Sequence, residues 1–166
     1  MALQLFKIAS TTVESPVTEI TFTSIPSGYT DLLILASVRD NRSSNAANDM
    51  TIRFNGSGTG YSWRRLYTDS GATIASNTSD TIAVIDSSTA TSNTFASVSL
   101  YIPNYLSSNN KSLSSDSVQE NNTTNAFLQI TAGLWSNSSA ITSIALAPAN
   151  SASFVANSTA TLYGIL

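Results

Sequence analysis

The carboxylates are the residues of this chain with the widest chemical range. The ten are Glu14, Glu19, Asp31, Asp40, Asp49, Asp69, Asp80, Asp86, Asp116 and Glu120. Their scatter leaves open a glycosidase pair, which distant strands can bring together. Cys and His are absent from the sequence, so a Cys nucleophile, a Ser-His-Asp triad and a zinc finger are excluded. We predict that the protein is not an enzyme, with no catalytic residue and no cofactor.

A metal site is the second chemistry to consider. Asp40, Asn41, Asn45 and Asp49 place carboxylate and amide oxygens in one polar stretch, and Ca²⁺ takes such ligands. Their spacing does not match an EF-hand loop. We therefore assign no metal and expect the protein to be insensitive to chelators.

The segment Gly56–Gly60 is the most motif-like stretch. A dinucleotide-binding fingerprint needs a sixth-position Gly that opens a helix, but here that position is Tyr61 and a strand pattern follows. The segment also has no Lys for a phosphate-binding loop. Because Gly adopts positive φ at low steric cost, the segment predicts a flexible hairpin connection.

Three aromatic residues, Tyr61, Trp63 and Tyr67, share one face of an alternating segment. Two interpretations stay open. The side chains can form an exposed stripe that stacks on sugar rings or packs on a partner. Alternatively, they can fill the interior of a sandwich, as large aromatic side chains commonly do.

The composition is polar but almost uncharged. Charged residues make up 10% of the 166 residues and the net charge is −3, whereas Ser, Thr and Asn together make up roughly two-fifths of the chain. This balance argues against a nucleic-acid partner, which calls for a basic surface. The longest apolar run, Leu32–Ala36, falls short of the roughly 20 residues of a membrane helix. The N-terminus lacks the features of a signal peptide, so we expect a cytoplasmic product with no membrane partner.

Alternation of apolar and polar residues recurs along the chain, and helical periodicity does not. Strands are predicted around 19–23, 32–38, 50–54, 61–67, 82–85, 98–102, 127–135, 144–147 and 159–165. These nine segments, counted as about eight strands, occur without a helix and predict an all-β fold, a two-sheet antiparallel sandwich that is jelly-roll-like. We expect a single domain over residues 1–166, with a short extended N-terminal segment of about residues 1–8.

Within this pattern, several local expectations are specific. Phe54 shares parity with Ile52 and is predicted to lie in the core. In the strand 127–135, either Phe127 or Leu128 leads the buried set. The stretches Asp40–Asp49 and Pro103–Thr124 are expected to be loops, because both are rich in polar residues.

Two parts of the sequence resemble a known group. Near the start these are Ile8–Thr12, Ile20–Pro26 and Tyr29–Leu33; near the end they are Ile141–Ile144, Phe154–Ala156 and Leu162–Ile165. The paired pattern is similar to small virion proteins of tailed bacteriophages. The resemblance implies a jelly-roll-like module with a capsid decoration (cement) or fibre-tip role, commonly as a homotrimer. It carries no functional residue across.

The resemblance implies a non-enzymatic structural protein on the capsid surface of the virion, made in the host bacterial cytoplasm. Its partners would be its own copies and the phage major capsid protein. The alternative is a head- or tail-fibre tip that binds a host-surface glycan. A compact chain without a fibrous repeat favours the decoration role. Candidate partner contacts are Met1, Leu3, Leu5 and Phe6 at the N-terminus and the aromatic residues Tyr61, Trp63 and Tyr67.

Overall fold

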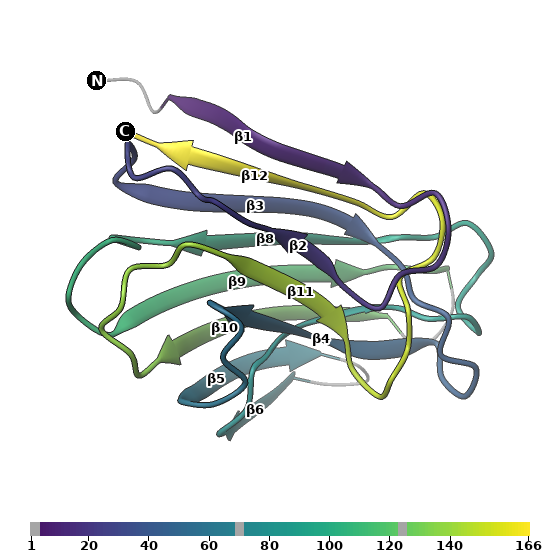
Figure 1. Ribbon diagram of the computed structural model, residues 1–166. Coiled ribbons are helices and arrows are strands. Elements are labelled where there is room, and N and C mark those ends of the chain that lie inside the picture. Colours follow the sequence, from purple (N-terminus) through teal and green to yellow (C-terminus); the bar gives the residue numbers. More distant parts are fainter. Residues whose placement is uncertain (1–3, 69–71, 123–125) are drawn as a thin grey trace.

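Two antiparallel sheets pack face to face in the computed structural model, which describes residues 4–68, 72–122 and 126–166 (Figure 1). These residues form twelve strands and no helix, so none of them belongs to a helix that could cross a membrane. The strands are β1 (Leu5–Thr12), β2 (Ile20–Phe22), β3 (Asp31–Val38), β4 (Ala47–Phe54), β5 (Tyr61–Thr68), β6 (Ala72–Asn77), β7 (Thr81–Asp86), β8 (Ala96–Ile102), β9 (Lys111–Gln119), β10 (Phe127–Trp135), β11 (Ile144–Pro148) and β12 (Thr159–Ile165). The predicted all-β sandwich is confirmed.

Eight of the strands follow a jelly-roll order. The larger sheet contains β1, β12, β3 and β8 as neighbours, and the smaller sheet contains β2, β11, β4 and β7. Along the chain, these eight strands alternate between the sheets at every step except that from β4 to β7, which pair directly. This arrangement of two four-stranded layers with long crossovers is the double-sheet jelly roll.

The other four strands are two hairpins inserted into the jelly roll. The hairpin β5–β6 lies between β4 and β7 in the sequence, and β9–β10 lies between β8 and β11. Both add to the larger sheet beyond β8, in the order β9, β10, β5 and β6, so that β1 and β6 are its two edges (Figure 1). We call these four strands the extension.

The core lies between the sheets and contains an aromatic cluster. Phe54 is fully buried, and its ring meets Trp135 edge-on at a centroid distance of 5.4 Å. The Tyr61 ring stacks on Trp135 at 6.1 Å, and the Phe54 backbone N–H donates a hydrogen bond to Tyr61 Oη. Burial raises the pKa of Tyr61 to about 12. The prediction that Phe54 is a core residue is confirmed.

The expectation that Pro103–Thr124 is a loop is wrong, because β9 occupies Lys111–Gln119. The strand has little apolar alternation: Leu113 is buried and Val118 is exposed on the other face. It is held instead by backbone pairing on both sides, with β8 and with β10. Together with β6, and with β1, which was expected only as an extended segment, it raises the number of strands above the predicted eight.

Two other local expectations need correction. The stretch Asp40–Asp49 is not wholly a loop, since β4 begins at Ala47 and pairs with β7. The segment Gly56–Gly60 joins β4 to β5, which belong to different sheets, so it is a crossover and not a hairpin. Gly56 and Gly60 have φ of 71° and 83°, which are positive values that glycine adopts at low steric cost.

Candidate interaction surface

The extension exposes five large apolar side chains on the outer face of the larger sheet. We call Leu66, Ile74, Val118, Leu128 and Ile130 the outer patch; they are exposed by 45%, 76%, 40%, 48% and 56%. Strand register makes them neighbours. Ile130 lies opposite Leu66, which in turn lies opposite Ile74, and Leu128 lies opposite Val118 in the next row. Contiguous exposed apolar surface of this kind commonly marks an interaction site.

Behind the outer patch, the inner face of β9 and β10 is polar, so the usual polarity of a half-buried sheet is inverted there, whereas the opposite ends of β5, β9 and β10 turn apolar side chains such as Trp135 into the core. Ser115, Ser117, Gln129 and Thr131 are all buried. They satisfy backbone groups along the edge of β7: Ser115 Oγ donates to the carbonyl of Ile82 at 2.5 Å, and the Val84 N–H donates to Ser117 Oγ at 3.2 Å.

Gln129 completes this polar layer. Its Nε2 donates to Thr131 Oγ1 at 2.8 Å and to the Ile82 carbonyl at 3.3 Å. Buried polar groups need such partners, because an unsatisfied one costs about 1–3 kcal/mol. The inward position of these residues therefore sends the alternating apolar residues of β10, Leu128 and Ile130, outward. Of the two sets that the sequence left open, the one led by Phe127 faces inward.

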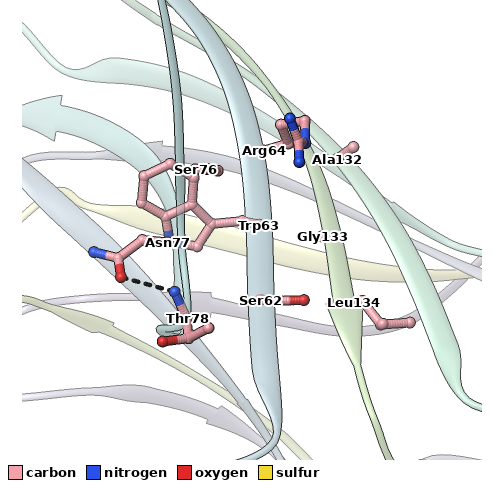
Figure 2. Close-up of a pocket in the computed structure, with 9 residues that line it drawn as sticks. All are labelled: Ser62, Trp63, Arg64, Ser76, Asn77, Thr78, Ala132, Gly133 and Leu134. Carbon is pink, nitrogen blue, oxygen red and sulfur yellow. Dashed lines mark hydrogen bonds between the residues drawn. The ribbon is translucent and has the colours of Figure 1, made fainter.

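A shallow hollow of about 420 Å³ adjoins the outer patch (Figure 2). It is lined by Ser62, Trp63, Arg64, Ser76, Asn77, Thr78, Ala132, Gly133 and Leu134. Its lining includes one charged residue, Arg64, and the Asn77 side chain is engaged in accepting a hydrogen bond from the backbone N–H of Thr78. With one cation and no acid in its lining, the hollow offers polar contacts beside the patch but no acid–base pair.

The aromatic residues proposed as partner contacts do not form an exposed stripe. Tyr61 and Trp63 are buried, so the core-packing interpretation holds for these two and the stacking interpretation is wrong for them. Tyr67 is half-buried. The guanidinium of Arg65 lies 4.5 Å from the centroid of Trp63 and 4.8 Å from that of Tyr67, so this cation occupies the ring faces that a sugar would need.

Arg65 is tied into this layer by further contacts. Its Nη1 lies 3.2 Å from Asp49 Oδ1 and 3.4 Å from Gln129 Oε1. A cation–π contact of this kind contributes about 0.5–2 kcal/mol. The stack of Trp63, Arg65 and Tyr67 thus joins β5 to β4 and β10, which is a structural role.

The N-terminal candidates lie at the opposite edge of the larger sheet. Met1 and Leu3 fall outside the described residues. Leu5 and Phe6 are partly exposed and belong to β1, where they pair with Ile165 and Gly164 of β12. The Phe6 ring also contacts Tyr29, at a centroid distance of 5.9 Å. The structure therefore does not bring the N-terminal and aromatic candidates together.

Both carboxylates considered for calcium are engaged in the protein's own interactions. The Asp40 carboxylate accepts from the Arg42 backbone N–H at 3.0 Å and from Asn48 Nδ2 at 2.6 Å, while Asp49 pairs with Arg65. Within residues 4–68, 72–122 and 126–166, no group of three or more acidic side chains gathers as a metal site.

A second buried polar group stands where β7 ends. Asp86 is fully buried and accepts a hydrogen bond from Gln119 Nε2 at 2.8 Å. Burial raises the pKa of the Asp86 carboxyl, and the hydrogen bond from Gln119 partly opposes this. Nearby, the Arg39 guanidinium donates to the carbonyls of Ala90, Thr91 and Thr94. This arrangement fixes the connection between β7 and β8.

The outer patch was missed by reasoning from the sequence, for a different reason in each strand. Val118 lies in a stretch expected to be a loop, and Ile74 lies in a strand that was not predicted. Leu128 and Ile130 do alternate in the sequence, but alternation alone does not say which face is buried. Comparisons of the chain with protein-family models, with curated proteins and with solved structures find no match.

Proposed function

We propose that this protein is a non-enzymatic structural protein that attaches to another protein through its outer patch. The observation that carries the proposal is the exposure of five large apolar side chains on one sheet face. Under the family resemblance, the protein is a capsid decoration protein and the partner is the phage major capsid protein.

The surroundings of the patch support a protein partner. Interface centres are apolar and depleted of charge, and their rims are polar. The patch fits this description, because its rows contain no charged residue except Asp116, which lies opposite Ile130. Arg64, exposed on the same face, lies one row further along β5. A rigid sheet also presents these side chains with little entropy left to lose on binding.

Among the residues that the structure describes, no comparable feature supports a glycan site. Carbohydrate binding would use free aromatic faces, and the candidate rings are buried or covered by Arg65. The fibre-tip function is therefore not proposed for this protein.

The first test is the copy number of the protein in purified virions, measured by quantitative mass spectrometry. A decoration protein is expected in hundreds of copies, on the order of the number of capsid subunits. A few or tens of copies would instead indicate a tail or fibre part, and absence from the particle would overturn the virion role.

The second test is rebinding to particles from which the protein has been stripped. Ile130→Asp places a charge at the centre of the patch and should weaken binding at least about tenfold, which corresponds to about 1.4 kcal/mol. The matched control is Ser114→Asp, an exposed position on the same face of β9 but outside the patch. Equal binding by the two variants would contradict the proposal.

A further inference from the structure

The sandwich has four sheet edges, and the two edges nearest the N-terminus are protected against pairing with another chain. The strand β1 carries Lys7 and a register shift between Lys7 and Ala9. The strand β2 is only three residues long. Charged side chains, bulges and short strands are the usual means by which proteins block an edge.

The third edge, β7, is protected by side chains of the extension. Its backbone carbonyl at Ile82 accepts from Ser115 Oγ and its N–H at Val84 donates to Ser117 Oγ. The polar inner layer of the extension thus satisfies groups that a neighbouring strand would otherwise take.

Within the described part of the chain, the fourth edge, β6, has none of these protections. Among the described residues, β5 is the only strand that pairs with β6. The β6 sequence, Ala-Thr-Ile-Ala-Ser-Asn, contains no charge and no proline, and its register with β5 runs without a bulge over six residue pairs. Ile74 in its middle is the most exposed large apolar residue of the structure. Such an edge is a ready template for another strand.

We propose that β6 pairs antiparallel with β6 of a second copy of this chain, around a two-fold axis at Ile74. In this register, Ile74 lies beside its own counterpart, Thr73 lies opposite Ala75, and Ala72 lies opposite Ser76. Residues on the same sheet face meet, as antiparallel pairing requires. The two larger sheets then form one continuous sheet.

A second copy suits this edge for three reasons. The strand carries no charge, so the identical strand meets it without repulsion. The pairing is isologous and closed, because it covers the β6 edge of both copies and leaves no unpaired β6 edge for a third copy. Pairing of β6 with β1 of the next copy would instead propagate into a fibre, and the bulge and Lys7 of β1 oppose it.

The pairing also changes the outer patch. Ile130, Leu66 and Ile74 already form a row across three strands. Across the two-fold axis, this row continues into Ile74, Leu66 and Ile130 of the second copy. The dimer therefore presents a doubled apolar strip on one face, and a surface that binds both halves gains affinity through effective concentration. The dimer itself does not depend on the proposed function.

The experiment is sedimentation velocity on the full chain over a concentration series, with native mass spectrometry to count the copies. We expect a dimer, and we expect Ile74→Lys to shift it to a monomer by placing two ammonium groups together at the axis. The matched control is Ile130→Lys, which changes the same sheet face two strands from the edge and should remain dimeric. Circular dichroism checks that both variants remain folded.

Hydrogen exchange gives a second measurement on the unaltered protein. Amide protection in β6 should rise with protein concentration, while protection in β1 stays constant. A wild-type monomer at the highest concentration, or the homotrimer that the family resemblance implies, would overturn the proposal. A monomer from both lysine variants would also overturn it, because that result indicates stacking through the outer patch and not pairing at the edge.

Discussion

The jelly roll and the extension share one sheet but are built on opposite principles. In the jelly roll, large apolar side chains such as Phe54, Leu100 and Phe154 fill the space between the sheets. In the extension, one end of the strands joins that core through Trp135, but behind the outer patch the inner face holds Ser117 and Gln129 and the apolar residues point outward. The jelly roll therefore supplies most of the buried apolar residues, and the extension exposes the outer patch through which we propose that a partner binds.

The largest expected effect comes from the jelly roll. Phe54→Ala removes a fully buried ring that packs on Trp135, and we expect the free energy of unfolding to fall by about 3–5 kcal/mol. In the extension, Ile130→Ala should change it by less than about 0.5 kcal/mol, since its side chain is largely exposed. Urea unfolding followed by circular dichroism measures both. If both variants lowered the free energy of unfolding by a similar amount, the two regions would not differ in their contribution to stability.

The polar layer of the extension should give an intermediate effect. Ser117→Ala leaves the buried N–H of Val84 without its acceptor, which should lower the free energy of unfolding by about 1–3 kcal/mol. The control is Ser114→Ala on the exposed face of the same strand, for which we expect almost no change. If the two serine variants unfold at the same urea concentration, the polar layer is not what joins the extension to β7.

The junction of the two regions should respond to pH. Asp86 ends β7 of the jelly roll and bonds to Gln119 of the extension, and burial raises the pKa of its carboxyl above the ordinary 3.8. The folded state thus holds this proton more tightly than the unfolded state. Compared with Asp86→Asn, the wild type should be relatively most stable below about pH 3.8 and should lose stability as pH rises through the raised pKa.

This prediction is checked by urea unfolding of both proteins at a series of pH values. The quantity of interest is the wild-type free energy of unfolding minus that of Asp86→Asn, because the subtraction removes the other carboxylates. A difference that stays constant, or that increases with pH, would contradict a raised pKa at Asp86.

The smallest expected effect is that of a chelator. Asp40 and Asp49 are both occupied by side chains or backbone groups of the protein itself, so EDTA should leave the melting temperature unchanged. A fall in melting temperature that Ca²⁺ restores would show that a bound ion stabilises the fold.

The jelly-roll part of the fold could be predicted from the sequence because apolar residues recur along its strands. The runs around Leu32–Val38 and Met50–Phe54 bury one face or both against a second sheet, and this requirement produces visible patterns. The same logic placed Phe54 in the core. A buried position can thus be predicted from the sequence where an apolar side chain occupies it.

Only part of the extension could be predicted in this way: the segments 61–67 and 127–135 predict β5 and β10, but β6 and β9 have no apolar pattern that predicts a strand. The strand β9 is stabilised by backbone pairing and by serine hydroxyls that bond to β7, and neither leaves an apolar period in the sequence. In β10 the apolar period is present but points outward. Its inward set becomes apparent only once β7 supplies the Ile82 carbonyl to Gln129, which also donates to Thr131.

The position of the two hairpins in the larger sheet also sets an order of assembly. The hairpin β5–β6 pairs with the rest of the sheet only through β10, although β5 ends at Thr68 and β10 begins at Phe127. During synthesis at about 5–20 residues per second, this hairpin must wait several seconds for its docking strand. Throughout that interval both of its edges are open, so the β5–β6 hairpin of the nascent chain can pair with other chains until β10 covers β5.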